Sequence, residues 1–320
     1  MSLAAASQAV SGLPSLTANM TQTAETFTRQ ALTDGGSTSW RYTETDTTYD
    51  ATPSDANFGL ATYSYEHTVP VNTAYDQCTS TTYAPVNTSE NLAGLVASTE
   101  TDSVACSGFT EGSVASAPNG LNTLGAPSVS RPAQVMSATE NFYDDTSFST
   151  TFPQTTAPTA GNVTMTRKAS GYSSGFTWQT TARDTYDSYG RVEDAYDGNG
   201  KETVTAYTVN SAGLTTGQTV TNPLSQQTSE TLDPTRNLAL TSTDANGVVT
   251  TEQYDALGRL TSVWLDSRPT SDEANYTYAY TVSDTGVSGT VAKTMGDQGG
   301  YATTVSILDS LGRTRQRRQL

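Results

Sequence analysis

A six-residue phrase that recurs in the second half of the chain constrains the fold more than any other feature. It reads Tyr-Asp-Ala-Leu-Gly-Arg at 254–259, with near copies at 186–191 and 308–313. An aspartate in the first turn position can accept a hydrogen bond from the backbone two residues on, and a glycine in the fourth can adopt positive φ. The phrase therefore predicts a tight reversal between antiparallel strands, which makes it architecture before it is a site.

The spacing of the candidate turns predicts consecutive hairpins. They begin at Asp187, Asp197, Asn210, Asn222, Asp233, Asp244 and Asp255, and again at Asp297 and Asp309. The first seven starts are 10, 13, 12, 11, 11 and 11 residues apart, and runs such as "KETVTAYTV" and "VVTTEQY" lie between them. This spacing is typical of successive antiparallel strands, and nothing between 40 and 320 carries a sustained helical stripe. We therefore predict an all-β fold in which 181–320 form consecutive antiparallel hairpins of one curved sheet, with no helix longer than two turns.

The phrase also predicts contacts between neighbouring hairpins. Its arginine follows the glycine, from where the guanidinium can reach a carboxylate on a neighbouring turn. Its tyrosine precedes the aspartate, so the ring can pack on the equivalent ring of the next hairpin.

Composition supports thin, wetted sheets rather than one thick core. Only 34% of the residues are hydrophobic and 15% are charged, and threonine, which favours strands, supplies roughly a fifth of the chain.

The net charge of −16 repels phosphate and disfavours nucleic-acid binding. The sequence contains no apolar run of about 18 residues, so it predicts no membrane span. The N-terminus lacks the pattern of a secretory signal. Cys78 and Cys106 are the only cysteines; their spacing leaves open whether they form a disulfide in an oxidising compartment or stay reduced.

The repeated phrase resembles the RHS/YD-repeat family, whose pattern Tyr-Asp-x-x-Gly-Arg-Leu is complete at 254–260, nearly complete at 186–192 and degraded at 308–314. The resemblance covers about 181–320, and upstream stretches such as "DQCTSTTYA" resemble the segment that precedes the repeats in actinobacterial secreted RHS proteins. The structural turn residues that it assigns are Tyr186, Asp187, Gly190, Arg191, Asp197, Gly200, Asp244, Gly247, Tyr254, Asp255, Gly258, Arg259, Asp309, Gly312 and Arg313.

The resemblance implies a spiralling β-sheet wound into a hollow shell, which in the family encloses a C-terminal toxin or effector. We therefore expect a secreted or cell-surface, non-catalytic scaffold without a cofactor, whose partner is the toxin or effector domain of a longer chain. The family's self-cleaving core would follow the repeats, so this chain is expected to be a fragment without core or toxin. The predicted organisation is a low-complexity segment at 1–38, an irregular β-rich region at 39–180, and a truncated repeat array at 181–320.

Catalytic and metal-binding alternatives are weaker. "GYSSG" at 171–175 matches a nucleophile elbow, but that motif needs a following helix and a downstream histidine, whereas the only histidine, His67, lies upstream and is expected to be a surface strand residue. "DGNGKETVTAYT" and "DANGVVTTEQYD" begin like calcium loops but lack the glutamate at position twelve. One histidine and two separated cysteines do not make a credible zinc site. Scattered acids such as Asp144 and Asp145 mark no particular glycosidase pair.

A binding function is the main alternative to a scaffold. Tyr276, Tyr278 and Tyr280 recur at every second position, so they share one face of a strand, where tyrosine rings can stack on sugars. The same three rings can simply pack against neighbouring strands. A carbohydrate-binding or adhesive cell-surface β-protein that contacts glycans is therefore the alternative function.

Overall fold

The computed structural model describes residues 2–8, 16–34, 37–110 and 122–320. The chain divides into two compact units, Met1–Gly200 (unit 1) and Lys201–Leu320 (unit 2). The predicted boundaries near residues 38 and 180 stay a prediction.

The strands of unit 1 are antiparallel and are joined by loops of varied length. The first two, β1 (Ser2–Gln8) and β2 (Leu16–Gln22), pair only with each other. The following nine pair in chain order: β3 (Glu25–Asp34), β4 (Ser37–Tyr49), β5 (Ala61–Thr68), β6 (Gln77–Tyr83), β7 (Val96–Asp102), β8 (Val135–Tyr143), β9 (Val163–Tyr172), β10 (Phe176–Tyr186) and β11 (Val192–Asp197). A short 3-10 turn, η1 (Thr73–Tyr75), lies between β5 and β6.

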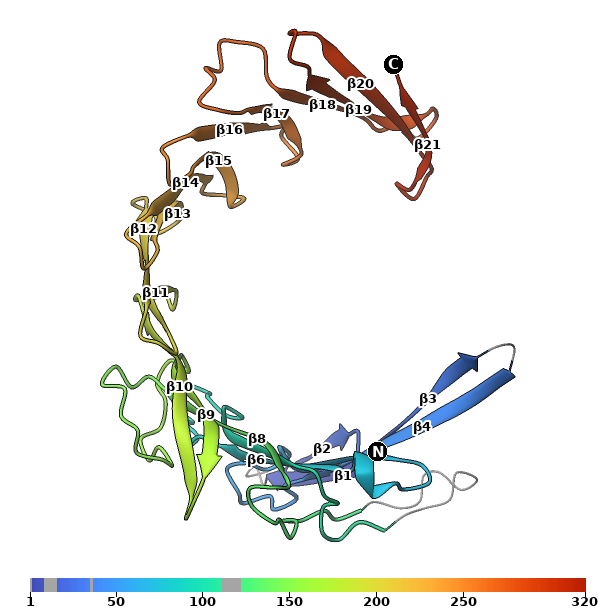
Figure 1. The fold of residues 1–320 in the computed structure, drawn as a ribbon, viewed down its shortest axis with the longest axis vertical. Coiled ribbons are helices and arrows are strands. Elements are labelled where there is room, and N and C mark those ends of the chain that lie inside the picture. Colours follow the sequence, from blue (N-terminus) through green and yellow to red (C-terminus); the bar gives the residue numbers. More distant parts are fainter. Residues whose placement is uncertain (1, 9–15, 35–36, 111–121) are drawn as a thin grey trace. The chain divides into compact units, whose positions relative to one another are not determined.

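Unit 2 is a ladder of shorter hairpins, which Figure 1 shows from yellow to red. Its strands are β12 (Glu202–Val209), β13 (Thr215–Thr221), β14 (Gln227–Asp233), β15 (Leu238–Thr243), β16 (Val249–Tyr254), β17 (Leu260–Trp264), β18 (Tyr276–Thr281), β19 (Ser288–Met295), β20 (Tyr301–Leu308) and β21 (Thr314–Gln319). Each pairs antiparallel with the next along the chain. The predicted all-β class and its consecutive antiparallel hairpins are confirmed.

The apolar interior is thin, as the composition predicts. The described residues of unit 1 form two small buried clusters, one around Tyr65 and Leu124 and the other around Tyr143. In unit 2, which is described throughout, the buried apolar side chains are Leu232, Val263, Trp264 and Ala274. Strand pairing and turn hydrogen bonds therefore carry much of the stability of unit 2, since little apolar surface is removed from water.

One predicted turn begins in a different place. The turn expected at Asp297 starts one residue earlier, because the Gly299 amide donates to the Gly296 carbonyl (2.9 Å) and the Gly296 amide donates to the Gly300 carbonyl (2.7 Å). A glycine can occupy the first turn position without a capping side chain, since backbone hydrogen bonds alone close the reversal.

Candidate functional site

The turn between β16 and β17 is closed by its own aspartate. Asp255 accepts hydrogen bonds at Oδ1 from the amides of Leu257 and Arg259, both at 2.9 Å, and at Oδ2 from Arg259 Nε at 2.7 Å. Gly258 has φ 78° and its amide donates to the Asp255 carbonyl at 2.9 Å. These hydrogen bonds, led by that of the Arg259 amide, lower the pKa of the Asp255 carboxyl. The carboxylate is thus used by the turn itself.

The same geometry recurs in both units. The other predicted turn aspartates, which each accept the amide two residues on, are Asp187, Asp197, Asp244 and Asp309. The other predicted turn glycines, which all have positive φ, are Gly190, Gly200, Gly247 and Gly312. In the calcium-like stretch at Asp244, one carboxylate oxygen accepts the amides of Asn246 (2.8 Å) and Val248 (2.9 Å). Backbone capping therefore accounts for the motif that resembles a calcium loop.

The expectation that each phrase arginine reaches a neighbouring turn is wrong. Arg191, Arg259 and Arg313 each pair with the aspartate four residues earlier, in their own turn. The reversal is so tight that the arginine amide and its guanidinium both return to that aspartate. A different residue links adjacent turns: Arg236 donates from its two terminal nitrogens to the carbonyls of Asp255 (3.3 Å) and Ala256 (2.7 Å).

The phrase tyrosines make contacts through their hydroxyls, and packing of their rings on the next hairpin stays a prediction. The Tyr186 hydroxyl donates to the Val163 carbonyl at 2.7 Å within unit 1. In unit 2 the Tyr254 hydroxyl contacts the Glu252 carboxylate, and burial together with this contact raises the pKa of Tyr254 to about 12.

The three tyrosines of β18 are all half-buried. Tyr280 donates its hydroxyl to the Leu260 carbonyl at 2.9 Å, and the Arg259 guanidinium carbon lies 4.6 Å from the centre of its ring. Tyr280 is therefore already engaged by the sheet. Glycan stacking on Tyr276 and Tyr278 stays a prediction.

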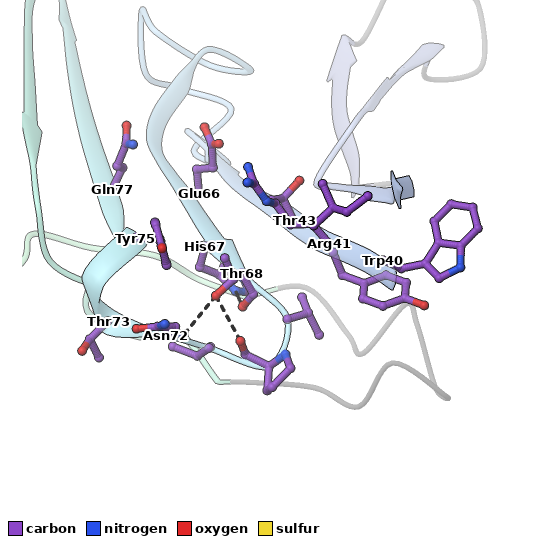
Figure 2. A pocket seen from close by; sticks show the side chains of 15 residues that line it. Trp40, Arg41, Thr43, Glu66, His67, Thr68, Asn72, Thr73, Tyr75 and Gln77 are labelled. Carbon is purple, nitrogen blue, oxygen red and sulfur yellow. Dashed lines mark hydrogen bonds between the residues drawn. The ribbon is translucent and has the colours of Figure 1, made fainter. Parts of the chain in front are cut away.

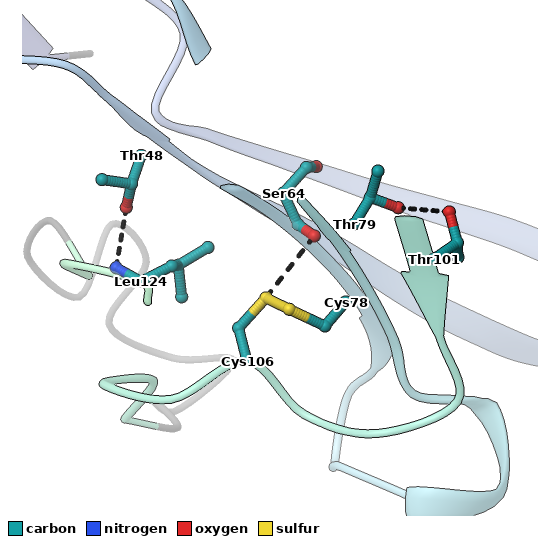
Figure 3. The surroundings of a disulfide bond; sticks show 7 residues. All are labelled: Thr48, Ser64, Cys78, Thr79, Thr101, Cys106 and Leu124. Atoms are coloured by element: carbon teal, nitrogen blue, oxygen red, sulfur yellow. Dashed lines mark hydrogen bonds between the residues drawn. A yellow bond between two sulfur atoms is a disulfide. The ribbon is translucent and has the colours of Figure 1, made fainter. Parts of the chain in front are cut away.

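Cys78 and Cys106 form a disulfide in unit 1 (Figure 3). Their Cα atoms lie 5.0 Å apart, and both residues are buried in the cluster with Tyr65 and Leu124. The bond closes a sequence separation of 28 residues, which in the chain-entropy model stabilises the fold by roughly 3–4 kcal/mol. Beside it, Thr48 Oγ1 accepts the Leu124 amide at 2.7 Å, so the segment after Asn122 is fastened to β4.

His67 is buried, which corrects its expected place on the surface. The side chain is 1% exposed and stacks on Tyr65, with ring centres 4.7 Å apart. Its Nδ1 lies 3.0 Å from the Thr68 carbonyl and its Nε2 lies 3.2 Å from Asp46 Oδ2. Burial alone would lower the pKa of His67, but the hydrogen bonds to Asp46 and Thr68 outweigh burial and raise it.

Two acids share this face with His67. Glu44 and Asp46 alternate on β4, and Glu44 lies opposite His67 in the β4–β5 register. Glu44 is 8% exposed and Asp46 is 2% exposed. Burial, followed by the charges of Asp46 and Glu25, raises the pKa of Glu44. We call Glu44, Asp46 and His67 the acid–histidine cluster.

A cavity of about 890 Å³ in unit 1 reaches this cluster at His67 (Figure 2). Its rim includes the exposed rings of Trp40 and Tyr75. Its loop is held by Thr68 Oγ1, which accepts the Asn72 amide and donates to the Pro70 carbonyl, both at 3.0 Å. The cavity thus combines a fixed loop, two aromatic rings and the edge of a buried polar cluster.

The nucleophile-elbow motif is a hairpin. β9 ends at Tyr172 and β10 begins at Phe176, and the Ser173 amide donates to the Gly175 carbonyl at 3.0 Å. A strand rather than a helix follows the serine, and the histidine is bound to Asp46. This arrangement lacks the parts that would activate Ser173.

Comparison with known proteins agrees with the turn geometry. Residues 235–263, which contain the Asp255 turn, match the family model RHS Repeat. The chain carries an RHS repeat. No curated protein sequence matches the chain significantly. Within the described residues, no helix is long and apolar enough to span a membrane.

Solved structures share the fold of this RHS-repeat chain. A crystal structure of TcdB2-TccC3-Cdc42 matches with a TM-score of 0.57 at 10% identity, over 92% of this chain and 22% of that one. TcdB2-TccC3 without its hypervariable C-terminal region matches with a TM-score of 0.59 at 10% identity, over 87% of this chain and 20% of that one. TcdB2-TccC3-TEV gives 0.55 at 11% identity, over 92% and 22%. The chain thus spans about a fifth of the structures that it matches.

Proposed function

We propose that this chain is a non-catalytic wall segment of an RHS-repeat β-shell, which encloses or presents a C-terminal toxin or effector domain of a longer protein. The turn chemistry of unit 2 carries this proposal. Its phrase aspartates are occupied by their own backbone and arginine, so the most repeated charged groups serve the fold. A catalyst instead needs a nucleophile, a base and an electrophilic group free to meet a substrate.

Two further observations support a secreted shell. The fold likeness to TcdB2-TccC3 structures favours a place in a toxin assembly. The disulfide between Cys78 and Cys106 favours an oxidising compartment, because cytosolic thiols are kept reduced. The partner in this proposal is the effector domain of the full-length chain.

Limited proteolysis of the natural full-length protein tests enclosure. If the wall surrounds a C-terminal domain, that domain resists protease while the wall is folded and is digested after the wall is unfolded in urea. The control is the C-terminal domain expressed without the wall, which should be digested in buffer alone. Equal digestion rates for the enclosed and separate domains would contradict the proposal.

Carbohydrate binding or adhesion is the second candidate function. The observation that favours it is the row of three half-buried tyrosines on one face of β18. A glycan array should then show binding that Tyr278→Ala removes while the circular dichroism spectrum is kept. A blank array would remove this candidate and leave the wall segment untouched.

A further inference from the structure

We propose that Glu44, Asp46 and His67 bind one divalent transition-metal ion of the zinc type in unit 1. Each residue offers one ligand atom, and these atoms all lie within 4.8 Å of one another. Strand register produces this set: Glu44 and Asp46 alternate on one face of β4, and His67 lies opposite Glu44 on β5. An imidazole nitrogen with two carboxylates is a donor set that zinc accepts, with a fourth position left for water.

The surrounding hydrogen bonds suit metal ligation. The Thr68 carbonyl lies 3.0 Å from His67 Nδ1, so Nδ1–H can donate to it while the lone pair of Nε2 points at the carboxylates. Metal-ligating histidines usually donate their second N–H to an oxygen in this way. Asn122 Nδ2 donates to Asp46 Oδ1 at 2.9 Å, which fixes that carboxylate and leaves Oδ2 on the side of His67. Both ligands are therefore oriented by partners outside the set of three.

The charge of the cluster favours a cation. Glu25 lies opposite Asp46 in the β3–β4 register, so a third acid stands on the face of the sheet that carries Glu44, Asp46 and His67. Three acids thus meet one imidazole in a place where Glu44, Asp46 and His67 are nearly out of water. Buried carboxylates are costly unless they are paired or coordinate a metal. One divalent ion would balance two of these acids while His67 stays neutral.

The cluster borders a cavity at one of its three residues. His67 lines the 890 Å³ cavity, whose wall also includes Thr43 and Glu66 (Figure 2). Glu66 is exposed and precedes His67 on β5, so its side chain points to the other face of the sheet. It therefore provides a nearby carboxylate that takes no part in the cluster. The ion would clamp β4 to β5 and, through Asn122, to the segment beside the disulfide.

Co²⁺ and Zn²⁺ titrations of the chelator-treated protein test the site. We expect Co²⁺ to produce visible d–d absorption bands that Zn²⁺ abolishes, with one ion per chain by calorimetry, and Zn²⁺ to raise Tm. Glu44→Gln should weaken Zn²⁺ binding by about 100-fold or more, since even outer partners of a metal ligand change affinity by about 10–100-fold. The control Glu66→Gln removes a nearby exposed carboxylate and should leave the affinity unchanged within about twofold, because exposed charges are screened.

Glu44→Gln keeps the shape of the side chain and removes a charge from an acidic, buried set, so the variant should fold without metal. His67→Gln should abolish the Co²⁺ bands by removing the only nitrogen ligand. The proposal is overturned if wild-type protein shows neither bands nor calorimetric binding at millimolar ion. It is equally overturned if Zn²⁺ affinity survives Glu44→Gln, or if Glu66→Gln weakens it as much.

Discussion

Replacing Gly258 by valine tests whether positive φ holds the repeat turn. Gly258 has φ +78°, and an added Cβ would lie 3.4 Å from Leu238 Cδ1 and 3.6 Å from Arg236 Cδ. Both distances are ordinary van der Waals contacts, so crowding adds little to the free-energy cost of the substitution. That cost comes from the backbone conformation. Holding a residue other than glycine in this region costs about 1–3 kcal/mol.

Native-state hydrogen exchange of the β16–β17 hairpin measures this cost directly, because local opening exposes its amides. Since each 1.4 kcal/mol is tenfold, amides of the 249–264 hairpin should exchange roughly 5- to 150-fold faster in Gly258→Val. Gly258→Asn should cost less, because asparagine tolerates positive φ and Asn237 already adopts φ 54° in the preceding turn of the same edge. Ala256→Ser, in the same turn, should be close to neutral. Equal exchange in all three variants would refute the proposed turn.

Three further outcomes are expected. Non-reducing mass spectrometry of protein from an oxidising compartment should find Cys78 joined to Cys106, and two free thiols there would contradict the pairing. Burial, with the charge of Glu100, raises the pKa of Asp102 to about 6. The contribution of the protonated Asp102 carboxyl to stability is therefore complete below about pH 4 and is lost as the pH rises to about 6. Asp102→Asn should therefore flatten the pH dependence of urea unfolding over that window and stabilise unit 1 at pH 7.5 by about 1–3 kcal/mol; an unchanged profile would exclude this origin. Ser173→Ala should leave ester hydrolysis at the blank rate, as in wild type, and serine-dependent hydrolysis would overturn the non-catalytic reading.

The hairpin ladder could be predicted because its chemistry is local. Asp255, Gly258 and Arg259 are within four residues of one another, and the same hydrogen bonds recur at the two other copies of the phrase. The same locality explains the error about the arginines: a guanidinium that returns to its own turn finds a carboxylate before it can reach the next hairpin. Arg236, which does bridge two turns, lies in a five-residue reversal that lacks the phrase.

The acid–histidine cluster could not be predicted from spacing, because 21 residues separate Asp46 from His67. Only the register of β4 against β5 places Glu44 opposite His67. A weak signal was present: Glu44 and Asp46 alternate within a strand-like run of threonines, so they must share a face. Whether that face is buried depends on the segment around Leu124 and the disulfide that covers it, which local sequence does not specify.

Replacing an acid of a repeat turn in unit 2 and replacing an acid of the acid–histidine cluster in unit 1 should change different measured quantities. Asp255 in unit 2 holds its own backbone, so Asp255→Ala should speed hydrogen exchange around the turn and leave Zn²⁺ affinity unchanged. Glu44 in unit 1 has a carboxylate on the face shared with His67, so Glu44→Gln should lower Zn²⁺ affinity and leave exchange in β16–β17 unchanged. Measuring both quantities on both variants decides the matter, since sites that share no partners contribute independently. If Asp255→Ala weakened Zn²⁺ binding as strongly as Glu44→Gln, the bound ion would have to lie at the repeat turns, and the turn acids would no longer be purely structural.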